Sequence, residues 1–250
     1  MSFEKSDGSD LSQLKKVALG KDEDMIASDT QRDYAKSIDS WALDAATIAK
    51  FTNNDCKLYL ASASQRRKDL LEQIAVFPDH IISADIDEKQ AKGESVREMT
   101  ARLANEKAAA VAPQVKDGYV LAADTAIEIG GKAMGKALHA QDVSKMLSRL
   151  SGRKHRVYSS VVLLKIQENK IVRAACKISK TTVALKAISV AELNEYVASG
   201  LGIGREGGFN IQTHLEAFVK SIDGSYSGII GLPLYETNNI LISLGYKNTR

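Results

Sequence analysis

The sequence has few of the features that mark secreted, membrane-spanning or disulfide-stapled proteins. Only 2 of the 250 residues are cysteines, and Cys56 and Cys176 are too far apart to suggest a metal site or a disulfide framework. We interpret both as free thiols in a reducing compartment. No apolar run approaches the roughly 20 residues that span a bilayer, and the N-terminus lacks the apolar segment of a secretory signal. We therefore expect a cytoplasmic protein without a membrane partner.

The sequence also lacks a strong charge imbalance and several well-known catalytic motifs. Its formal net charge is only +3, so any positive field must be local, and it offers no aromatic platform for stacking bases. We therefore expect no nucleic-acid partner. No GxxxxGK[ST] loop and no Ser-His-Asp or Cys-His arrangement is present, which disfavours a kinase and a serine hydrolase.

The chain divides into a polar N-terminal extension and one folded domain. Residues 1–28 are rich in Ser, Asp, Lys and Gly, which is typical of a mobile leader. Residues 30–51 carry apolar side chains at helical spacing, which predicts an amphipathic helix. We assign residues 1–55 to this extension and residues 56–250 to the domain, which has ample material for a core.

Within the domain, helices and strands alternate first, and antiparallel strands dominate later. Two capping boxes, Ser95 with Glu98 and Ser189 with Glu192, predict helices that begin at these serines. Three strands in a meander are expected over residues 155–166, 171–178 and 181–188. Further helices are expected after residue 64, over 143–150 and over 237–244. This order predicts an α/β protein with a mixed sheet and two lobes around a central cleft.

The stretch that organises the domain is residues 119–136. Its apolar run reads as a buried strand that ends in Asp124 and Thr125, and a glycine-glycine hairpin then returns with Lys132 and Lys136. Strand ends in open α/β sheets are common ligand sites. An equally weighted alternative is that Asp124 caps a loop and the lysines are solvated edge charges.

A second candidate site follows the first predicted strand. Ser62 or Ser64 is a suitable helix N-cap, which places Arg66 and Arg67 in the first helical turn. Cations are unfavourable there because the helix dipole is positive at that end, so a bound anion would explain them. Backbone N–H groups, serine hydroxyls and guanidinium groups together suit phosphate. The alternative is that the arginines pair with acids of the same helix, namely Asp69 and Glu72.

Four other polar residues are candidates. Lys107 falls on the apolar stripe of the helix that begins at Ser95, where it either snorkels or reaches into a cleft. Glu88 ends an acidic cluster, and Gln212 lies in the glycine-rich loop 202–213, where its amide suits a base edge or phosphate oxygens. His155 is best interpreted as a satisfied structural histidine. Carboxylates together with Arg and Lys side chains suit a triphosphate with Mg²⁺.

The motifs resemble those of the Maf family of nucleoside triphosphate pyrophosphatases, distant relatives of the inosine triphosphatases. The matching segments run in order over about residues 57–245. They are the L-A-S-A-S-Q-R-R at 60–67, D-I-D-E at 85–88, R-L-A-N-E-K-A at 102–108, A-D-T at 123–125, G-K at 135–136, L-S-G at 150–152 with H-R-V at 155–157, I-Q at 211–212 and G-L-P-L at 231–234.

The resemblance implies a fold, a reaction and roles for particular residues. Family members hydrolyse the α–β phosphoanhydride of a nucleoside triphosphate with Mg²⁺ or Mn²⁺, and the motifs are most similar to the branch that prefers dTTP and UTP. Asp124 would be a general base or a metal-associated carboxylate, and Glu88 would help to hold the metal. Lys107 and Lys136 would complete the catalytic group. The substrate-binding residues would be Ser62, Ser64, Arg66, Arg67, Thr125 and Gln212.

The chain departs from the family pattern at several positions. Gln65 and Ala137 stand where the family has proline, and Thr213 replaces the glycine after Ile-Gln. Ser159 and Ser160 replace Thr-Gly. Arg205-Glu206-Gly207 replaces Lys-Ala-Gly, which brings a carboxylate close to the nucleotide. A homodimer is expected from the resemblance alone. The rival hypothesis is a nucleotide-binding regulator of cell division with little turnover, but both carboxylates are retained, which favours an enzyme.

Overall fold

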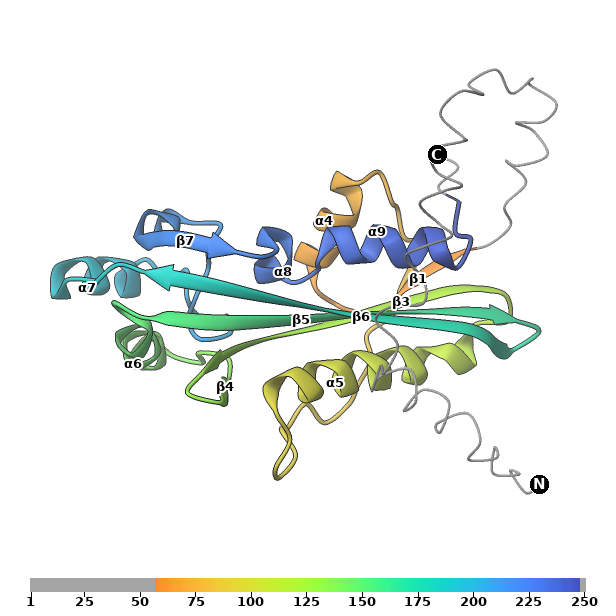
Figure 1. Cartoon of the computed structure of the whole chain (residues 1–250), viewed down its shortest axis with the longest axis horizontal. Helices are drawn as coiled ribbons and strands as arrows, with labels where there is room; N and C mark the ends of the chain where they lie inside the picture. Colours follow the sequence, from red (N-terminus) through yellow and green to blue (C-terminus); the bar gives the residue numbers. More distant parts are fainter. Residues whose placement is uncertain (1–56, 248–250) are drawn as a thin grey trace, which may run out of the picture.

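The computed structural model describes residues 57–247, so the predicted N-terminal extension lies outside it. One seven-stranded mixed sheet forms the centre, with the order β2-β1-β3-β5-β6-β7 and with β4 paired to β3 (Figure 1). The pairs β1–β2 and β1–β3 are parallel, and the others are antiparallel. The strands are β1 (Leu58–Leu60), β2 (His80–Ile81), β3 (Gly118–Ile129), β4 (Lys132–Met134), β5 (Lys154–Gln167), β6 (Lys170–Leu185) and β7 (Val219–Asp223).

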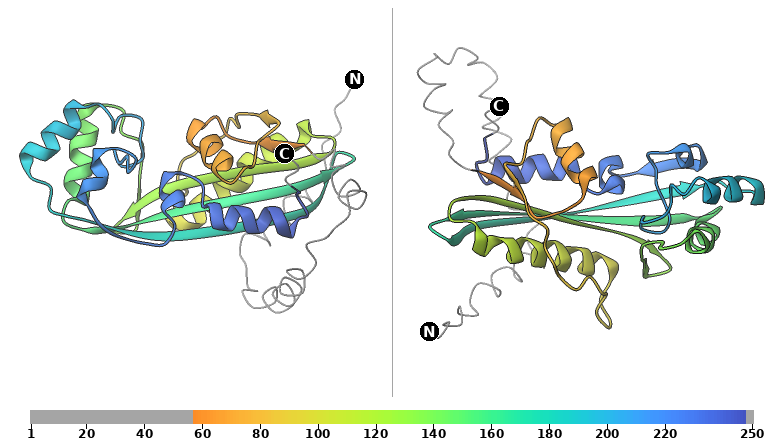
Figure 2. Two further views of the ribbon diagram at one scale, coloured as in Figure 1. Left: turned by 90° about the horizontal axis from the view of Figure 1, so that it is seen from above. Right: turned by 180° about the vertical axis from the view of Figure 1, so that it is seen from behind.

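Helices cover both faces of this sheet. Helix α5 crosses one face against β3 and β5, whereas α4, α8 and α9 lie on the opposite face (Figure 1). Helices α6 and α7 pack together at one end of the long strands, away from α4 and α9 (Figure 2). The bounds are α4 (Gln65–Gln73), α5 (Val96–Val111), α6 (Ala140–Leu150), α7 (Val190–Ala198), α8 (Tyr226–Ile230) and α9 (Leu234–Ser243), with 3₁₀ turns η1 (Ala112–Gln114) and η2 (His214–Phe218).

The central strand β3 is buried on both sides, which explains its continuous apolar sequence. Val120 and Ala122 pack in a cluster with small residues of α5 such as Ala104 and Ala108. Leu121 belongs to the larger cluster on the other face, together with residues of α4 and α9. The small alanines let α5 approach the sheet closely, and a side chain at any position of this run meets a packed layer.

Local sequence signals located most elements correctly. Both capping boxes are present, at Ser95 of α5 and at Ser189 of α7, and each pairs the serine with the glutamate three residues later. The predicted mixed-sheet α/β class is confirmed. Helix α9 begins three residues before its predicted start because Pro233 precedes it as the N-cap.

The predicted three-strand meander is wrong. β6 continues without a break across residues 178–181, where Ser179 pairs with Ser159 and Lys180 pairs with Tyr158 of β5. No glycine, proline or asparagine occurs there to form a turn, so the ladder to β5 keeps the strand extended. Strand β7 and helix α8 were missed because their short segments read as loops around Gly224.

His155 is structural, as predicted, but it is not satisfied by hydrogen bonds. It lies 1% exposed at the start of β5 with its ring edge-on to Phe209. Neither ring nitrogen has a hydrogen-bond partner within residues 57–247. Burial lowers the pKa of His155 to about 4. The folded protein therefore holds the neutral imidazole, which must become charged in acid.

This burial predicts an acid-dependent loss of stability at His155. The pKa of the folded state lies below the unfolded value, so the stabilisation is present above pH 6.5 and is lost as the pH falls towards 4. The loss from pH 7.5 to pH 4 should be about 3 kcal/mol, at 1.36 kcal/mol per pKa unit. In urea unfolding, His155→Leu should lose less stability than the wild type over that interval. The exposed His214→Leu is the control, and equal losses in all three proteins would exclude His155 as the cause.

Candidate active site

Asp124 lies in the middle of β3, and the prediction that the strand ends there is wrong. β3 continues to Ile129 because β5 pairs with it throughout, with Asp124 opposite Ser160. The parallel neighbour β1, however, ends at Leu60, whose partner is Leu121. Asp124 is therefore three residues beyond the end of its parallel neighbour. The gap left by β1 gives the carboxylate access to a cleft, as a strand end would have done.

Lys107 reaches into this cleft from α5. Its Nζ atom lies 2.6 Å from Oδ1 of Asp124 and 2.6 Å from Oε1 of Glu88. Lys107 and Asp124 are both buried, at 7% and 6% exposed, while Glu88 is open to solvent. Nζ of Lys136 lies 3.4 Å from the other oxygen of Glu88. Of the two alternatives for Lys107, the cleft is correct, and one ammonium group bridges two carboxylates.

The environment pushes the pKa values of these two carboxyl groups in opposite directions. Burial raises the pKa of Asp124 above its usual value, although the ammonium of Lys107 and the guanidinium of Arg67 oppose it. Burial also acts on Glu88, but its hydrogen bond and charge contact with Lys107, with help from Lys136, hold its pKa below the usual value. Asp124 is thus the more basic carboxylate, and Glu88 is the more firmly ionised one.

The N-terminus of α4 forms another wall of the cleft. Ser64 is the N-cap, but its side chain caps no backbone group, and the first turn contains no acidic residue. Arg67 donates from Nε to the carbonyl of Gly231 at 2.9 Å and from Nη1 to Oγ of Ser62 at 2.9 Å. Nε of Arg66 is buried without a partner among the described residues. This end of α4 therefore presents unsatisfied donors and positive charge.

The alternative in which the arginines pair with acids of their own helix is wrong. Asp69 accepts a hydrogen bond from Nε2 of Gln65 at 2.7 Å, and Glu72 pairs with Lys68 at 3.5 Å. The departure from proline at position 65 thus gives Asp69 a neutral partner. Both guanidinium groups remain oriented towards the cleft, which both residues line.

The structure brings nearly all predicted site residues to one cleft. Those that line it are Ser64, Arg66, Arg67, Glu88, Lys107, Asp124, Thr125, Lys136 and Gln212. Ser62 does not line it but fixes Arg67 from behind and accepts a hydrogen bond from the backbone N–H of Ser64 at 3.2 Å. Lys132 is exposed on β4 and is not part of the lining. The hairpin was expected to bring both Lys132 and Lys136 near Asp124, and this expectation is correct only for Lys136.

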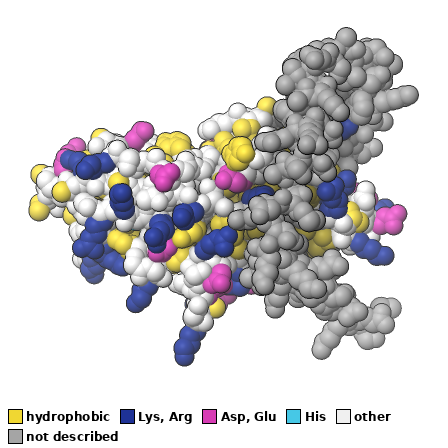
Figure 3. Space-filling view, in the orientation of Figure 1, with side chains coloured by type: hydrophobic (Ala, Val, Ile, Leu, Met, Phe, Trp, Pro, Cys, Tyr) yellow, Lys and Arg dark blue, Asp and Glu magenta, His cyan; other side chains and the backbone are white. Residues whose placement is uncertain are grey.

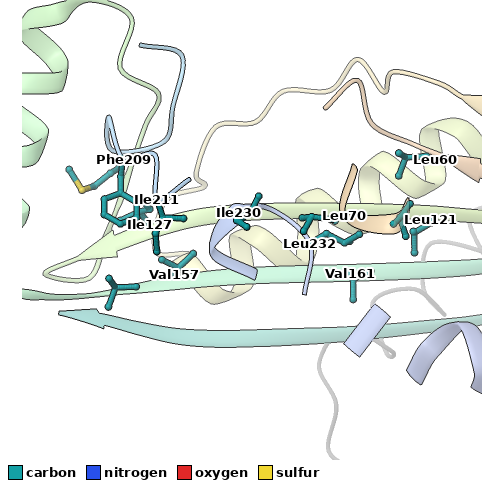
Figure 4. Packing of buried hydrophobic residues seen from close by; sticks show 14 of the residues in the cluster. Leu60, Leu70, Leu121, Ile127, Val157, Val161, Phe209, Ile211, Ile230 and Leu232 are labelled. Carbon is teal, nitrogen blue, oxygen red and sulfur yellow. The ribbon is translucent and has the colours of Figure 1, made fainter. Parts of the chain in front are cut away.

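Sequence reasoning missed part of the wall opposite α4. The loop 202–213 adds Phe209 and Asn210, which were not predicted, and Glu206, whose carboxylate was expected close to the nucleotide. Phe209 and Ile211 pack beside Ile127 of β3 and give this wall an apolar base (Figure 4). The apolar residues had no signal beyond their place in a glycine-rich loop. For Glu206 the sequence did give a signal, because Arg205-Glu206-Gly207 departs from the Lys-Ala-Gly of the family pattern.

The carboxylates fit a hard divalent cation only with help from a ligand. No group of three or more His, Cys, Asp or Glu side chains within residues 57–247 could hold a metal ion. Glu88 and Asp124 supply two carboxylates, and Mg²⁺ is often held by one or two carboxylates together with substrate phosphates and water. The donor set therefore suits a cation that arrives with a phosphate chain, and Glu88 and Asp124 are the residues that would hold it.

No helix within residues 57–247 is long and apolar enough to cross a membrane. On the face visible in Figure 3, acidic side chains occur among the Lys and Arg side chains. Cys176, on β6, is a free thiol, and burial raises its pKa to about 11.

Fold and cleft together define an α/β protein with a mixed sheet and one charged cleft, in which cations from two helices and a hairpin surround paired carboxylates. Comparison with known proteins gives the family. The chain belongs to the family of Maf-like proteins, whose model matches residues 57–244.

Several curated relatives match the same region. A "dTTP/UTP pyrophosphatase" of Sphingopyxis alaskensis is 45% identical over 188 residues, which cover 75% of this chain and 96% of the relative. A protein of the same name from Caulobacter vibrioides is 44% identical over 190 residues, 76% of this chain and 96% of the relative. A "Nucleoside triphosphate pyrophosphatase" of Orientia tsutsugamushi is 39% identical over 193 residues, 77% and 94% of the two chains.

Proposed function

We propose that this protein is a nucleoside triphosphate pyrophosphatase that hydrolyses dTTP and UTP. Water attacks the α-phosphorus, the bond to the bridging α–β oxygen breaks, and a nucleoside monophosphate and pyrophosphate leave. The observation that carries the proposal is the ammonium of Lys107 between Asp124 and Glu88, beside the N-terminus of α4. The names of the relatives supply the substrate class.

Asp124 has the properties of the general base. Its carboxylate is buried, its pKa is raised by burial, and it borders the cleft. A raised pKa favours uptake of a proton from attacking water near neutral pH. Lys107 keeps the Asp124 carboxylate oriented, because its Nζ atom donates a hydrogen bond to Oδ1 of Asp124 at 2.6 Å.

The cations of the cleft bind the phosphate chain and stabilise the charge that develops on it. Arg66 and Arg67 lie in the first turn of α4, the end of a helix that favours an anion, and Lys136 lies beside Glu88 in the same cleft lining. Ser64, Thr125 and Gln212 line the same space and supply neutral hydrogen-bonding groups, while Ser62 positions Arg67.

A divalent cation, Mg²⁺ or Mn²⁺, belongs to this proposal. Glu88 and Asp124 would hold it together with phosphate oxygens, and it would neutralise phosphate charge and polarise the reacting phosphoryl group. A cytoplasmic location and a homodimeric state are proposed on the resemblance and the composition. A regulatory nucleotide-binding protein of cell division, with little turnover, is the second candidate, and the retained Asp124 and Glu88 weigh against it.

The experiment that tests the function is pyrophosphate release from a panel of canonical, deoxy and modified nucleoside triphosphates, with Mg²⁺, with Mn²⁺ and with a chelator. We expect metal-dependent release with the monophosphate as the other product, fastest for dTTP and UTP. Tight nucleotide binding without release from any of them would reject the enzyme and favour the regulatory protein. Release of inorganic phosphate instead of pyrophosphate would reject cleavage at the α–β bond.

The helix-terminus phosphate site predicts a specific effect of Arg67→Ala. Removal of a charge-assisted contact with phosphate should weaken binding of a non-hydrolysable triphosphate analogue about tenfold or more, since such hydrogen bonds contribute about 1.5–3 kcal/mol. Isothermal titration measures the change. Arg173→Ala removes the same side chain from an exposed position of β6 and should bind as the wild type does. An unaltered isotherm for Arg67→Ala would contradict the site at α4.

A further inference from the structure

Glu206 occupies the cleft without a partner. It lies half-buried in the loop 202–213, and its backbone forms an isolated bridge with that of Lys136. The ammonium of Lys136 contacts Glu88 instead. The carboxyl group of Glu206 accepts no hydrogen bond and forms no ion pair within residues 57–247, although it lines the cleft. Its carboxyl oxygens therefore keep their capacity to accept hydrogen bonds from a ligand in the cleft.

The loop holds Glu206 in this position. Gly207 and Gly208 follow it with φ of +62° and +65°, a backbone conformation that side-chain-bearing residues rarely adopt. A Cβ atom at Gly207 would lie 3.1 Å from Cδ1 of Ile127, and one at Gly208 would lie 3.0 Å from Cα of Val143. The backbone at these two glycines is therefore packed tightly against β3 and α6, which fixes the position of the Glu206 backbone at the cleft.

Glu206 shares the cleft with Asp124 and Glu88, the carboxylates proposed to act at the α-phosphorus. Burial raises its pKa to about 7, the ammonium groups of Lys136 and Lys107 lower it, and the carboxylates of Asp124 and Glu88 raise it further. Glu206 thus lies within electrostatic reach of the carboxylates proposed to act at the α-phosphorus. The α-phosphate is bonded to the sugar, so the group beside it on the nucleoside side faces sugar hydroxyls. Above its pKa of about 7, the ionised carboxylate of Glu206 repels phosphate and accepts hydrogen bonds from hydroxyl groups. Nucleotide affinities are therefore compared at about pH 8.

We propose that Glu206 is a specificity-determining residue that accepts a hydrogen bond from a hydroxyl group of the nucleotide sugar. The inference rests on the proposed function, because the position of the α-phosphate defines the sugar side of the cleft. A carboxylate that binds ribose hydroxyls is a known solution in dinucleotide-binding folds. In this chain the carboxylate stands where the resembling family carries alanine.

The test compares the affinity for four probes: the α,β-imido analogues of UTP, dUTP and 2′,3′-dideoxyUTP, and inorganic tripolyphosphate. In the wild type, the UTP analogue should bind about tenfold more tightly than the dideoxy analogue, and Glu206→Ala should bring this ratio close to one. The ratio removes any general effect of charge on phosphate binding. Glu206→Gln keeps an acceptor oxygen, so its ratio should lie between those of the wild type and Glu206→Ala. Glu195→Ala, at an exposed position of α7, should keep the wild-type ratio.

The dUTP analogue identifies the hydroxyl. Binding like that of UTP assigns the 3′-hydroxyl, and binding like that of the dideoxy analogue assigns the 2′-hydroxyl. A ratio of one in the wild type, or the wild-type ratio in Glu206→Ala, overturns the inference, as does a variant whose only change is tighter binding of all four probes. If the wild type binds none of the probes, tripolyphosphate included, the proposed function itself has failed. Because the three nucleotide analogues carry a nitrogen in place of the α–β bridging oxygen and resist cleavage there, the ratio of their affinities is independent of turnover.

Discussion

Asp124→Asn should reduce pyrophosphate release by about a thousandfold, within the range that general-base catalysis contributes. The amide has nearly the same shape as the carboxylate, but it cannot take a proton from water. Its oxygen can still accept the hydrogen bond from Nζ of Lys107, now held at 2.6 Å. The substitution therefore leaves most of the cleft in place, and turnover at saturating nucleotide measures the loss.

Nucleotide affinity is the control for this substitution. Binding rests mainly on the cations, and Glu88 and the phosphate oxygens still hold the metal in this variant. The dissociation constant of a non-hydrolysable triphosphate should therefore stay within about tenfold of the wild-type value. Asp223→Asn makes the same chemical change at an exposed position on β7 and should leave turnover unchanged. Unchanged turnover in Asp124→Asn would remove Asp124 from its role, and a loss of affinity equal to the loss of turnover would make it a binding residue.

The local chemistry of the site could be read from the sequence because each signal is short-range. The serine that precedes Arg66 and Arg67 marks the start of α4, and the capping box at Ser95 sets the phase of α5. That phase puts Lys107 on the buried stripe with Leu103 and Val111. Periodicity alone could not distinguish a snorkelling lysine from one in a cleft, since the distinction depends on Asp124 from another element.

Strand lengths were less predictable because they depend on partners. The apolar run of β3 stops at Ala123, but hydrogen bonds to β5 continue the strand through Asp124 and Thr125. The ladder between β5 and β6 likewise prevents a break near Ser179 in β6. Pairing between distant segments therefore overrode the local pattern in both places. The predicted position of the site was nevertheless correct, although β3 does not end at Asp124. The short strand β1 ends before this position, and its end opens the cleft.

The loop 202–213 contributed the residues that were hardest to foresee. Phe209 and Ile211 reach the cleft only because Gly207 and Gly208 allow the backbone to pack against Ile127 and Val143. Such contacts join positions about 60 to 80 residues apart in the chain, and no periodicity encodes them. Glu206 was noticeable as a departure from the family pattern, but its lack of a partner is visible only in three dimensions.

Lys107→Met should remove both activity and much of the stability of the domain. The ammonium of Lys107 is the counter-charge of the buried Asp124 carboxylate, and methionine fills a similar volume without a charge. Removal of one partner of a buried pair costs about 3–5 kcal/mol, because the other charge stays buried and uncompensated. The contact with the solvent-exposed Glu88 adds little to this figure because water screens it. Urea unfolding at pH 7 measures the free energy of unfolding.

The pH dependence separates this electrostatic cause from a packing defect. Without Lys107, the folded-state pKa of Asp124 rises further above its unfolded value. A group of this kind stabilises the fold below the unfolded pKa and loses that stabilisation as the pH rises through the folded pKa. The difference in the free energy of unfolding between the wild type and Lys107→Met should therefore become smaller as the pH is lowered from 7 to 5. A deficit that is constant over this interval would indicate a packing defect instead.

A double-mutant cycle completes the argument for Lys107. Lys107→Met with Asp124→Asn replaces the buried pair by two neutral side chains, so the double variant should recover most of the stability lost in Lys107→Met alone. Lys145→Met, at an exposed position of α6, is the matched control and should unfold like the wild type. The double variant must remain inactive even when stable, because it lacks the proposed base. Stability without turnover would show that Lys107 serves the fold by neutralising the same carboxylate that it orients for catalysis.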